Sequence, residues 1–82
     1  MKDKALQKTQ ESIGKKLMEL RLAKGYTSHE SFALDYELPR VHYWRIEKGK
    51  INLTLKTLCK ILEIHGLTVE EFFHQMRQES KK

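Results

Sequence analysis

The stretch PRVHYWRIEKGK, residues 39–50, decides how the rest of the chain is interpreted. It sets Tyr43 and Trp44 among four basic residues, with a single acidic residue in the whole segment. Proline suits the first position of a helix, and glycine suits the residue just after a helix ends. We therefore expect a short helix over residues 39–48, closed by Gly49. This helix is expected to be basic and aromatic on its surface.

Charge is distributed unevenly along the 82 residues, which carry a net charge of +5 and are 39% hydrophobic. Residues 25–39 contain three acidic residues and no Lys or Arg, and residues 40–50 are basic again. A basic segment after an acidic one is typical of a surface patch suited to a polyanion, although helices also alternate charge for solubility.

The sequence lacks a pair of cysteines, a signal peptide and a membrane span, and these absences bear on the cellular compartment of the protein. Cys59 is the only cysteine, which rules out an internal disulfide. Residues 1–10 are polar and unlike a signal peptide, and no apolar run approaches the roughly 20 residues of a membrane span. We therefore expect a cytoplasmic protein with no membrane partner.

The hydrophobic periodicity is helical throughout, which predicts an all-α chain of five helices. One domain is expected over residues 11–77, between a flexible basic N-terminal arm at residues 1–10 and a flexible tail at residues 78–82. The alternative for residues 1–10 is that they extend the first helix. The expected helix boundaries are Ser12 to Gly25, Thr27 or Ser28 to Pro39, Thr54 to before Gly66, and a last helix opened by a capping box of Thr68 and Glu71.

The second and third helices are expected to be joined by about three residues, as in a helix-turn-helix. The chain resembles the Cro/repressor-like (XRE-type) DNA-binding domains over roughly residues 13–73. The resemblance runs through IGKKLMELRLAKG, TSHESFALDY, RIEKGK and LTLKTLCKILEIHGLTVEEFF. It implies a compact five-helix bundle of the lambda-repressor-like type, with the third helix in the major groove.

Three positions depart from the pattern of that family. The segment over residues 25–28 is one residue longer than the common pattern. Glu37 stands where the family often has a glycine in the turn. Pro39 replaces the usual Ser or Thr cap of the recognition helix. These departures concern the geometry of the turn between the second and third helices.

The resemblance implies which residues would meet DNA, and their chemistry agrees. Arginine can bridge guanine O6 and N7, and a valine can pack on a thymine methyl. The expected base-reading residues are Arg40, Val41, His42 and Arg45. The expected phosphate contacts are Ser28, His29, Lys48, Lys50 and Asn52. Tyr43 and Ile46 are expected to anchor the helix inward, and Trp44 is expected to touch either DNA or the loop over residues 50–52.

Two charges fall on faces that should be buried. Arg21 follows Leu17 and Ile13 on the apolar stripe of the first helix, and Glu47 follows Tyr43 on an inward side of the third. Charges on packed apolar faces are expected to pair with each other. In the family, an Arg and a Glu at these positions typically form such a pair. The alternative is that both side chains lean outward and end in water.

Other chemistries find little support in the sequence. The four histidines and Cys59 lack the spacing that closes a zinc site, so no metal or other cofactor is expected. Cys59 is expected to be buried, and His65 to lie at the C-terminus of the fourth helix. No catalytic set or glycine-rich phosphate loop is recognisable, so an enzyme is not expected.

The expected function is sequence-specific binding of double-stranded DNA by a small transcriptional regulator, most simply a repressor associated with the nucleoid. Phe72, Phe73 and Met76 give the last helix more apolar surface than a short terminal helix needs. We expect this surface to form a homodimer that binds a palindromic operator. The alternative is a protein-interaction module, such as an antitoxin, that uses the same surface for a partner protein.

Overall fold

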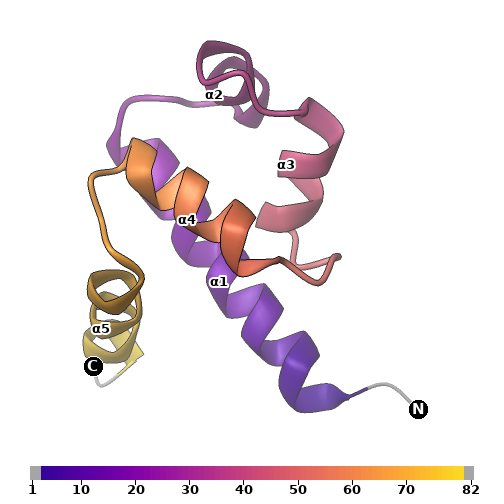
Figure 1. The fold of residues 1–82 in the computed structure, drawn as a ribbon, viewed down its shortest axis with the longest axis vertical. Helices are drawn as coiled ribbons and strands as arrows, with labels where there is room; N and C mark the ends of the chain where they lie inside the picture. The colour runs from indigo at the N-terminus through magenta and orange to yellow at the C-terminus, as the bar shows by residue number, and fades with distance from the viewer. Residues whose placement is uncertain (1–2, 81–82) are drawn as a thin grey trace. The chain divides into compact units, whose positions relative to one another are not determined.

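The computed structural model describes residues 3–80, which contain five helices and no strand (Figure 1). The helices are α1 (Lys4–Ala23), α2 (His29–Asp35), α3 (Arg40–Glu47), α4 (Leu55–Ile64) and α5 (Val69–Ser80). The all-α class expected from the sequence is confirmed. The chain divides into two compact units at residues 52 and 53, so that α1–α3 form the first and α4–α5 the second.

Aromatic rings fill the core of the first unit, in which α3 packs on both α1 and α2. The ring of Phe32, fully buried, lies 5.3 Å from the ring of Tyr26, 4.9 Å from that of Tyr36 and 5.1 Å from that of Tyr43, measured between centroids. Ile46 is also buried. Tyr43 and Ile46 therefore anchor α3 inward, as expected.

A glycine sets the closeness of α1 to α3. A Cβ built on Gly14 would lie 2.5 Å from the carbonyl oxygen of Ile46 and would also overlap the carbonyl of Glu47. Both neighbours are backbone atoms, which cannot swing aside as a side chain can. The last turn of α3 therefore rests on α1 at a distance that only glycine permits.

The helices α1 to α4 all end in the same hydrogen-bonded motif, in which the amide two residues beyond the C-cap bonds the carbonyl five residues earlier. These bonds join Tyr26 to Arg21, Leu38 to Ala33, Lys50 to Arg45, and Leu67 to Leu62, at 2.8–3.1 Å. The motif needs a left-handed residue. Gly25, Gly49 and Gly66 supply it with φ of 100°, 68° and 68°, and Glu37 supplies it after α2 with φ of 56°.

The expected N-caps are largely confirmed. Ser28 caps α2 and Thr54 caps α4, each with a side-chain oxygen that accepts a backbone amide. The capping box before α5 is present, since the Glu71 carboxylate accepts the Thr68 amide at 2.8 Å and the Thr68 hydroxyl accepts the Glu71 amide at 3.1 Å. Pro39 is the N-cap of α3, with φ of −60° and no side-chain hydrogen bond.

In the second unit α4 packs on α5, and the buried residues are Leu58, Ile61, Leu62 and Phe72. The expectation that Cys59 is buried was wrong, because its side chain is exposed. Leu55, on the same stripe, is 70% exposed. The buried face of α4 is therefore centred on Leu58, Ile61 and Leu62, and the stripe from Leu55 to Cys59 lies at its edge. His65 is the C-cap of α4, as expected.

Both ends of the chain are more helical than expected. Helix α1 begins at Lys4, not near Ser12, because the Asp3 carboxylate accepts the amides of Ala5 and Leu6 at 3.0 and 3.2 Å. Residues 4–10 therefore extend the first helix, the alternative left open for the predicted arm. Helix α5 includes residues 78–80, the first part of the predicted tail. The remaining parts of the arm and tail, residues 1–2 and 81–82, lie outside the described residues.

The left-handed backbone at Glu37 generates a stability prediction. A left-handed conformation destabilises the folded state by about 1–2 kcal/mol when the residue is not glycine. Glycine avoids this strain, but it lowers the free energy of unfolding by about 0.4–1 kcal/mol because it increases the conformational entropy of the unfolded chain. Glu37 is exposed and its side chain makes no hydrogen bond that would be lost. Glu37→Gly should therefore raise the free energy of unfolding by about 0.5–1 kcal/mol, measured by urea denaturation.

The matched control for this change is Glu19→Gly, at an exposed position inside α1. Glycine there should lower the free energy of unfolding by about 1 kcal/mol, because it weakens a regular helix. An equal decrease in the free energy of unfolding in the two variants would show that the left-handed conformation of Glu37 costs no free energy.

Candidate nucleic-acid interface

Helix α3 has one buried and one exposed face. Tyr43, Ile46 and Glu47 point inward. The four residues expected to read bases are all exposed, on the side opposite the core: Arg40, Val41, His42 and Arg45. The isolated apolar side chain of Val41 is 56% exposed. This surface offers two guanidinium groups, an imidazole and a methyl-bearing side chain, which together can hydrogen-bond base edges and contact a thymine methyl.

Trp44 lies between the two faces of α3. The residue is half-buried, whereas Arg40 and Arg45 on the same helix are exposed. A contact with DNA and a contact with the loop after α3 both remain predictions.

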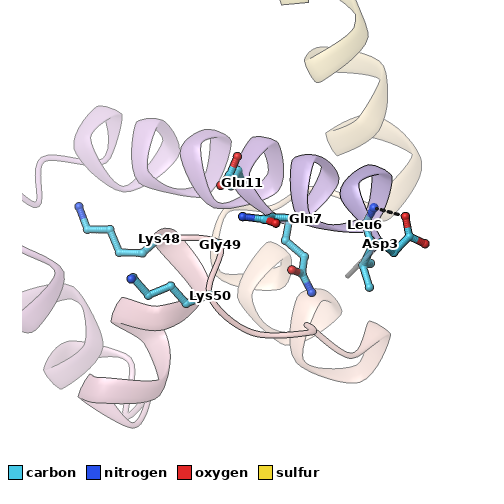
Figure 2. A pocket seen from close by; sticks show the side chains of 8 residues that line it. Asp3, Leu6, Gln7, Glu11, Lys48, Gly49 and Lys50 are labelled. Carbon is cyan, nitrogen blue, oxygen red and sulfur yellow. Dashed lines mark hydrogen bonds between the residues drawn. The ribbon is translucent and has the colours of Figure 1, made fainter. Parts of the chain in front are cut away.

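Basic residues follow α3 directly. Lys48 is the C-cap, and Lys48, Lys50 and Asn52 are all exposed. Figure 2 shows the two lysine side chains extending from the loop beside α1. Because Gly49 is left-handed and lies against Glu11 of α1, this loop has a fixed path.

The other expected phosphate contacts are at the start of α2. Ser28 and His29 are half-buried. The Ser28 hydroxyl oxygen accepts the Ser31 amide at 3.1 Å and lies 2.5 Å from the Ser31 hydroxyl oxygen. Its first role is therefore to cap α2, and any contact to DNA has to be made in addition.

The expected pair of Arg21 and Glu47 is present and buried, with 6% and 8% of each residue exposed. Arg21 Nε donates to Glu47 Oε2 at 2.8 Å, and a terminal nitrogen donates to Oε1 at 3.2 Å. The other terminal nitrogen donates to the carbonyl of Tyr26 at 2.8 Å. The hydrogen bonds to Glu47 raise the pKa of Arg21, so the guanidinium stays charged. Planar, two-point pairing of this kind is the strong form of an ion pair.

Tyrosines surround this pair. Burial, and then the neighbouring Glu47 carboxylate, raises the pKa of the Tyr43 hydroxyl, which therefore stays neutral. Tyr26 donates a hydrogen bond to the Asp35 carboxylate at 2.7 Å, and this bond raises the pKa of Tyr26. The bond ties the segment over residues 25–28 to the end of α2. No motif in the sequence indicated the bond to Asp35 or the one from Arg21 to the Tyr26 carbonyl.

The expected apolar surface of α5 is smaller than predicted. Phe72 is fully buried, so its inclusion in an exposed contact surface was wrong. Phe73 is 39% exposed and Met76 is half-buried, and the rings of the two phenylalanines meet edge to face at 5.3 Å. Phe72 therefore belongs to the core, and Phe73 with Met76 forms the accessible part.

Neither a membrane span nor a metal site is present within residues 3–80. No helix there is long and apolar enough to cross a membrane. No group of three or more His, Cys, Asp or Glu side chains in that range is arranged to hold a metal ion.

A helix-turn-helix family model matches residues 17–72, which include α2, α3 and the whole of α4. The chain belongs to this family, in its Cro/repressor-like (XRE-type) form, and is a DNA-binding regulator of transcription.

Among individual proteins, the chain is 42% identical over 67 residues to the control protein C.MunI of a Mycoplasma species, covering 82% of this chain and 90% of that protein. A crystal structure of the restriction-modification controller protein C.AhdI from Aeromonas hydrophila matches with a TM-score of 0.68 and 29% identity, covering 79% of this chain and 97% of that one. The plasmid copy control protein CopR of Streptococcus agalactiae is 38% identical over 50 residues, 61% of this chain and 54% of that protein.

The buried ion pair generates a second prediction. Glu47→Ala leaves the Arg21 guanidinium buried without its carboxylate, which should lower the free energy of unfolding by about 3–5 kcal/mol. DNA binding would then be lost with the fold. In the double variant Arg21→Met/Glu47→Leu, apolar side chains replace both charges, and the loss should be smaller than in either single variant.

Thermal melting measures the stability of these variants, with Glu19→Ala at an exposed position of α1 as the control. A Glu47→Ala protein that melts together with the wild type would contradict a structural role for the pair.

Proposed function

We propose that this chain is the controller protein of a restriction–modification system and acts as a homodimer on a palindromic operator, mainly as a repressor. The observation that carries the proposal is the exposed face of α3, on which Arg40, Val41, His42 and Arg45 stand above a rigid, ion-paired core. The likeness to the control protein C.MunI and to the controller C.AhdI supports the biological setting. A regulator of this kind works in the cytoplasm, on the nucleoid.

In this proposal α3 lies in the major groove. Arg40 and Arg45, five residues apart on the helix, can each make two hydrogen bonds to a guanine. Val41 lies between them along the chain and is placed to contact a thymine methyl. His42, at the edge of the exposed face, donates to a base acceptor or a phosphate.

The backbone of the DNA is held on both sides of the recognition helix. Lys48, Lys50 and Asn52 follow α3 and contact one strand, and Ser28 and His29 at the start of α2 contact the other. These contacts fix the angle at which α3 enters the groove, and they carry no sequence information themselves.

The first experiment is selection of bound sequences from a random DNA pool, followed by titration of binding with salt. A DNA-binding regulator selects a palindrome and loses affinity steeply as salt rises, because counterions are released when phosphates are neutralised. The single tryptophan, Trp44, lies on α3 and provides a fluorescence signal for the titration. No selected motif and a flat salt response would favour the protein-interaction module, such as an antitoxin, instead.

The assignment of base readers makes a third prediction. Arg40→Ala and Arg45→Ala should each cost about 1–3 kcal/mol of binding free energy on the operator and relax the preference at one base position. Lys50→Ala, which is also exposed and removes the same charge, should weaken all sequences alike and reduce the salt dependence. Repeating the selection with each variant tests this. An unchanged motif from Arg45→Ala would remove Arg45 from the base-reading set.

The dimer makes a fourth prediction. One recognition helix reads only a few base pairs, so useful specificity requires two, with half-sites about one helical turn apart. Phe73 is exposed and Met76 is half-buried on α5, and these two residues are proposed as the contact. Phe73→Glu should therefore shift the protein toward monomer in sedimentation and weaken operator binding.

Leu22→Glu, at a 46% exposed apolar position on α1, is the control and should leave association unchanged. One chain bound per palindrome by the wild type would contradict the dimer.

A further inference from the structure

The first turns of α1 carry lysines outside the region that the family model matches, which begins at residue 17. Residues 4–9 are all exposed, although they are helical and capped by Asp3. Lys4, Lys8 and Lys15 recur at spacings of four and seven residues, which places them on one stripe of the helix. The first turn of α1 contains no acidic residue after the capping Asp3, so Lys4 lies at the positive end of the helix dipole, where a lysine does not stabilise the helix.

Glu11 lies on the same stripe and connects it to the loop after α3. A Cβ built on Gly49 would lie 2.7 Å from Glu11 Cα and 2.9 Å from its Cγ, so the loop backbone rests directly on α1. Lys48 and Lys50 flank Gly49 and are exposed. The lysine stripe of α1 therefore passes Glu11, next to the loop that carries Lys48 and Lys50, within the first unit.

An open groove of about 640 Å³ lies between the first turns of α1 and this loop (Figure 2). Its walls carry the amides of Gln7 and Gln10, the ammonium groups of Lys48 and Lys50, and also Leu6 and the carboxylates of Asp3 and Glu11. Amide and ammonium groups of this kind donate hydrogen bonds to phosphate oxygens. The groove therefore places two amide donors of α1 beside the loop lysines, and the α1 lysines lie outside it, along the exposed stripe.

We propose that Lys4, Lys8 and Lys15 extend the DNA interface onto the sugar–phosphate backbone beyond the half-site that α3 reads. The inference rests on the proposed contact of Lys48 and Lys50 with phosphate. Lys4 lies seven residues before Glu11, or about 10 Å along the helix axis. Successive phosphates of one strand advance about 3.4 Å along the duplex axis, so this length of helix equals the span of about three phosphates.

The test is a salt titration of the full chain on the operator and on a random duplex, comparing Lys4→Ala/Lys8→Ala with the wild type. Each lost phosphate contact lowers the slope of log affinity against log salt by about 0.9. When salt is raised from about 50 to 200 mM, the affinity of the wild type should therefore fall by a factor about ten times larger than that of the double variant, on both duplexes. The selected base motif should stay the same, because these lysines read no bases.

Two further variants check the charge itself. Lys4→Arg/Lys8→Arg keeps both charges and should keep the wild-type slope. Glu11→Gln removes the carboxylate at nearly constant shape and should tighten binding to both duplexes. Alanine is a strong helix former, so the double alanine variant should melt no lower than the wild type and its binding loss cannot come from unfolding.

A duplex trimmed to the ends of the two half-sites separates direct contact from a general loss of positive charge. The wild type and the double alanine variant should bind this short duplex equally, because the flanking phosphates are gone. Two results would overturn the extension. One is a double variant whose slope of log affinity against log salt equals that of the wild type on the long duplex. The other is a difference in affinity between the two proteins that is the same on the long and the short duplex. If the extension fails alone, Lys50→Ala still lowers the slope; if the proposed function fails, the wild type itself shows no salt dependence.

Discussion

The first unit depends on one guanidinium. Arg21 bonds both oxygens of Glu47 in the last turn of α3 and, with its remaining terminal nitrogen, the carbonyl of Tyr26 just after α1. One side chain therefore holds α1, the connection to α2 and the recognition helix together. Gly14 lets the helices approach closely enough for this, because α3 carbonyls occupy the space of a side chain there. The exposed face of α3 inherits its orientation from these contacts.

Much of the fold could be predicted because its determinants are local. Glycine at a left-handed position, a hydroxyl before a helix and a glutamate three residues later each act within a few residues, so the ends of α1, α3 and α4 and the capping box of α5 were correctly expected. The end of α2 was expected at Pro39 but lies at Asp35, because the left-handed residue that follows it is Glu37 and not a glycine. The start of α1 was not correctly expected either, because residues 4–12 have no periodic apolar face. What makes them helical is the Asp3 cap and the strong intrinsic propensity of Lys, Ala, Leu, Gln and Glu.

The errors came where a pattern leaves more than one packing open. Leu55, Cys59 and Leu62 share a stripe of α4, yet only Leu62 is buried, because periodicity does not fix which edge of a broad apolar face is covered. Phe72 and Phe73 are adjacent and both apolar, and only the packing of α5 decides that Phe72 is the core residue. In the candidate interface, the exposed residues of α3 were expected from the resemblance to the family and from the chemistry of their side chains. The hydrogen bond of Tyr26 to Asp35 was not, because it depends on the path of a connecting segment.

Pro39, the N-cap of α3, restricts the backbone at the start of the recognition helix without a side-chain hydrogen bond. A Ser or Thr cap fixes the first turn through a hydrogen bond that water can compete for. Pro39 instead fixes the backbone covalently, at φ of −60°, and restricts the residue before it. The entry of α3 is thus already restricted in the unfolded chain and costs less entropy to order on folding. A helix preorganised in this way meets DNA with its first turn set, so association does not have to include the ordering of that turn.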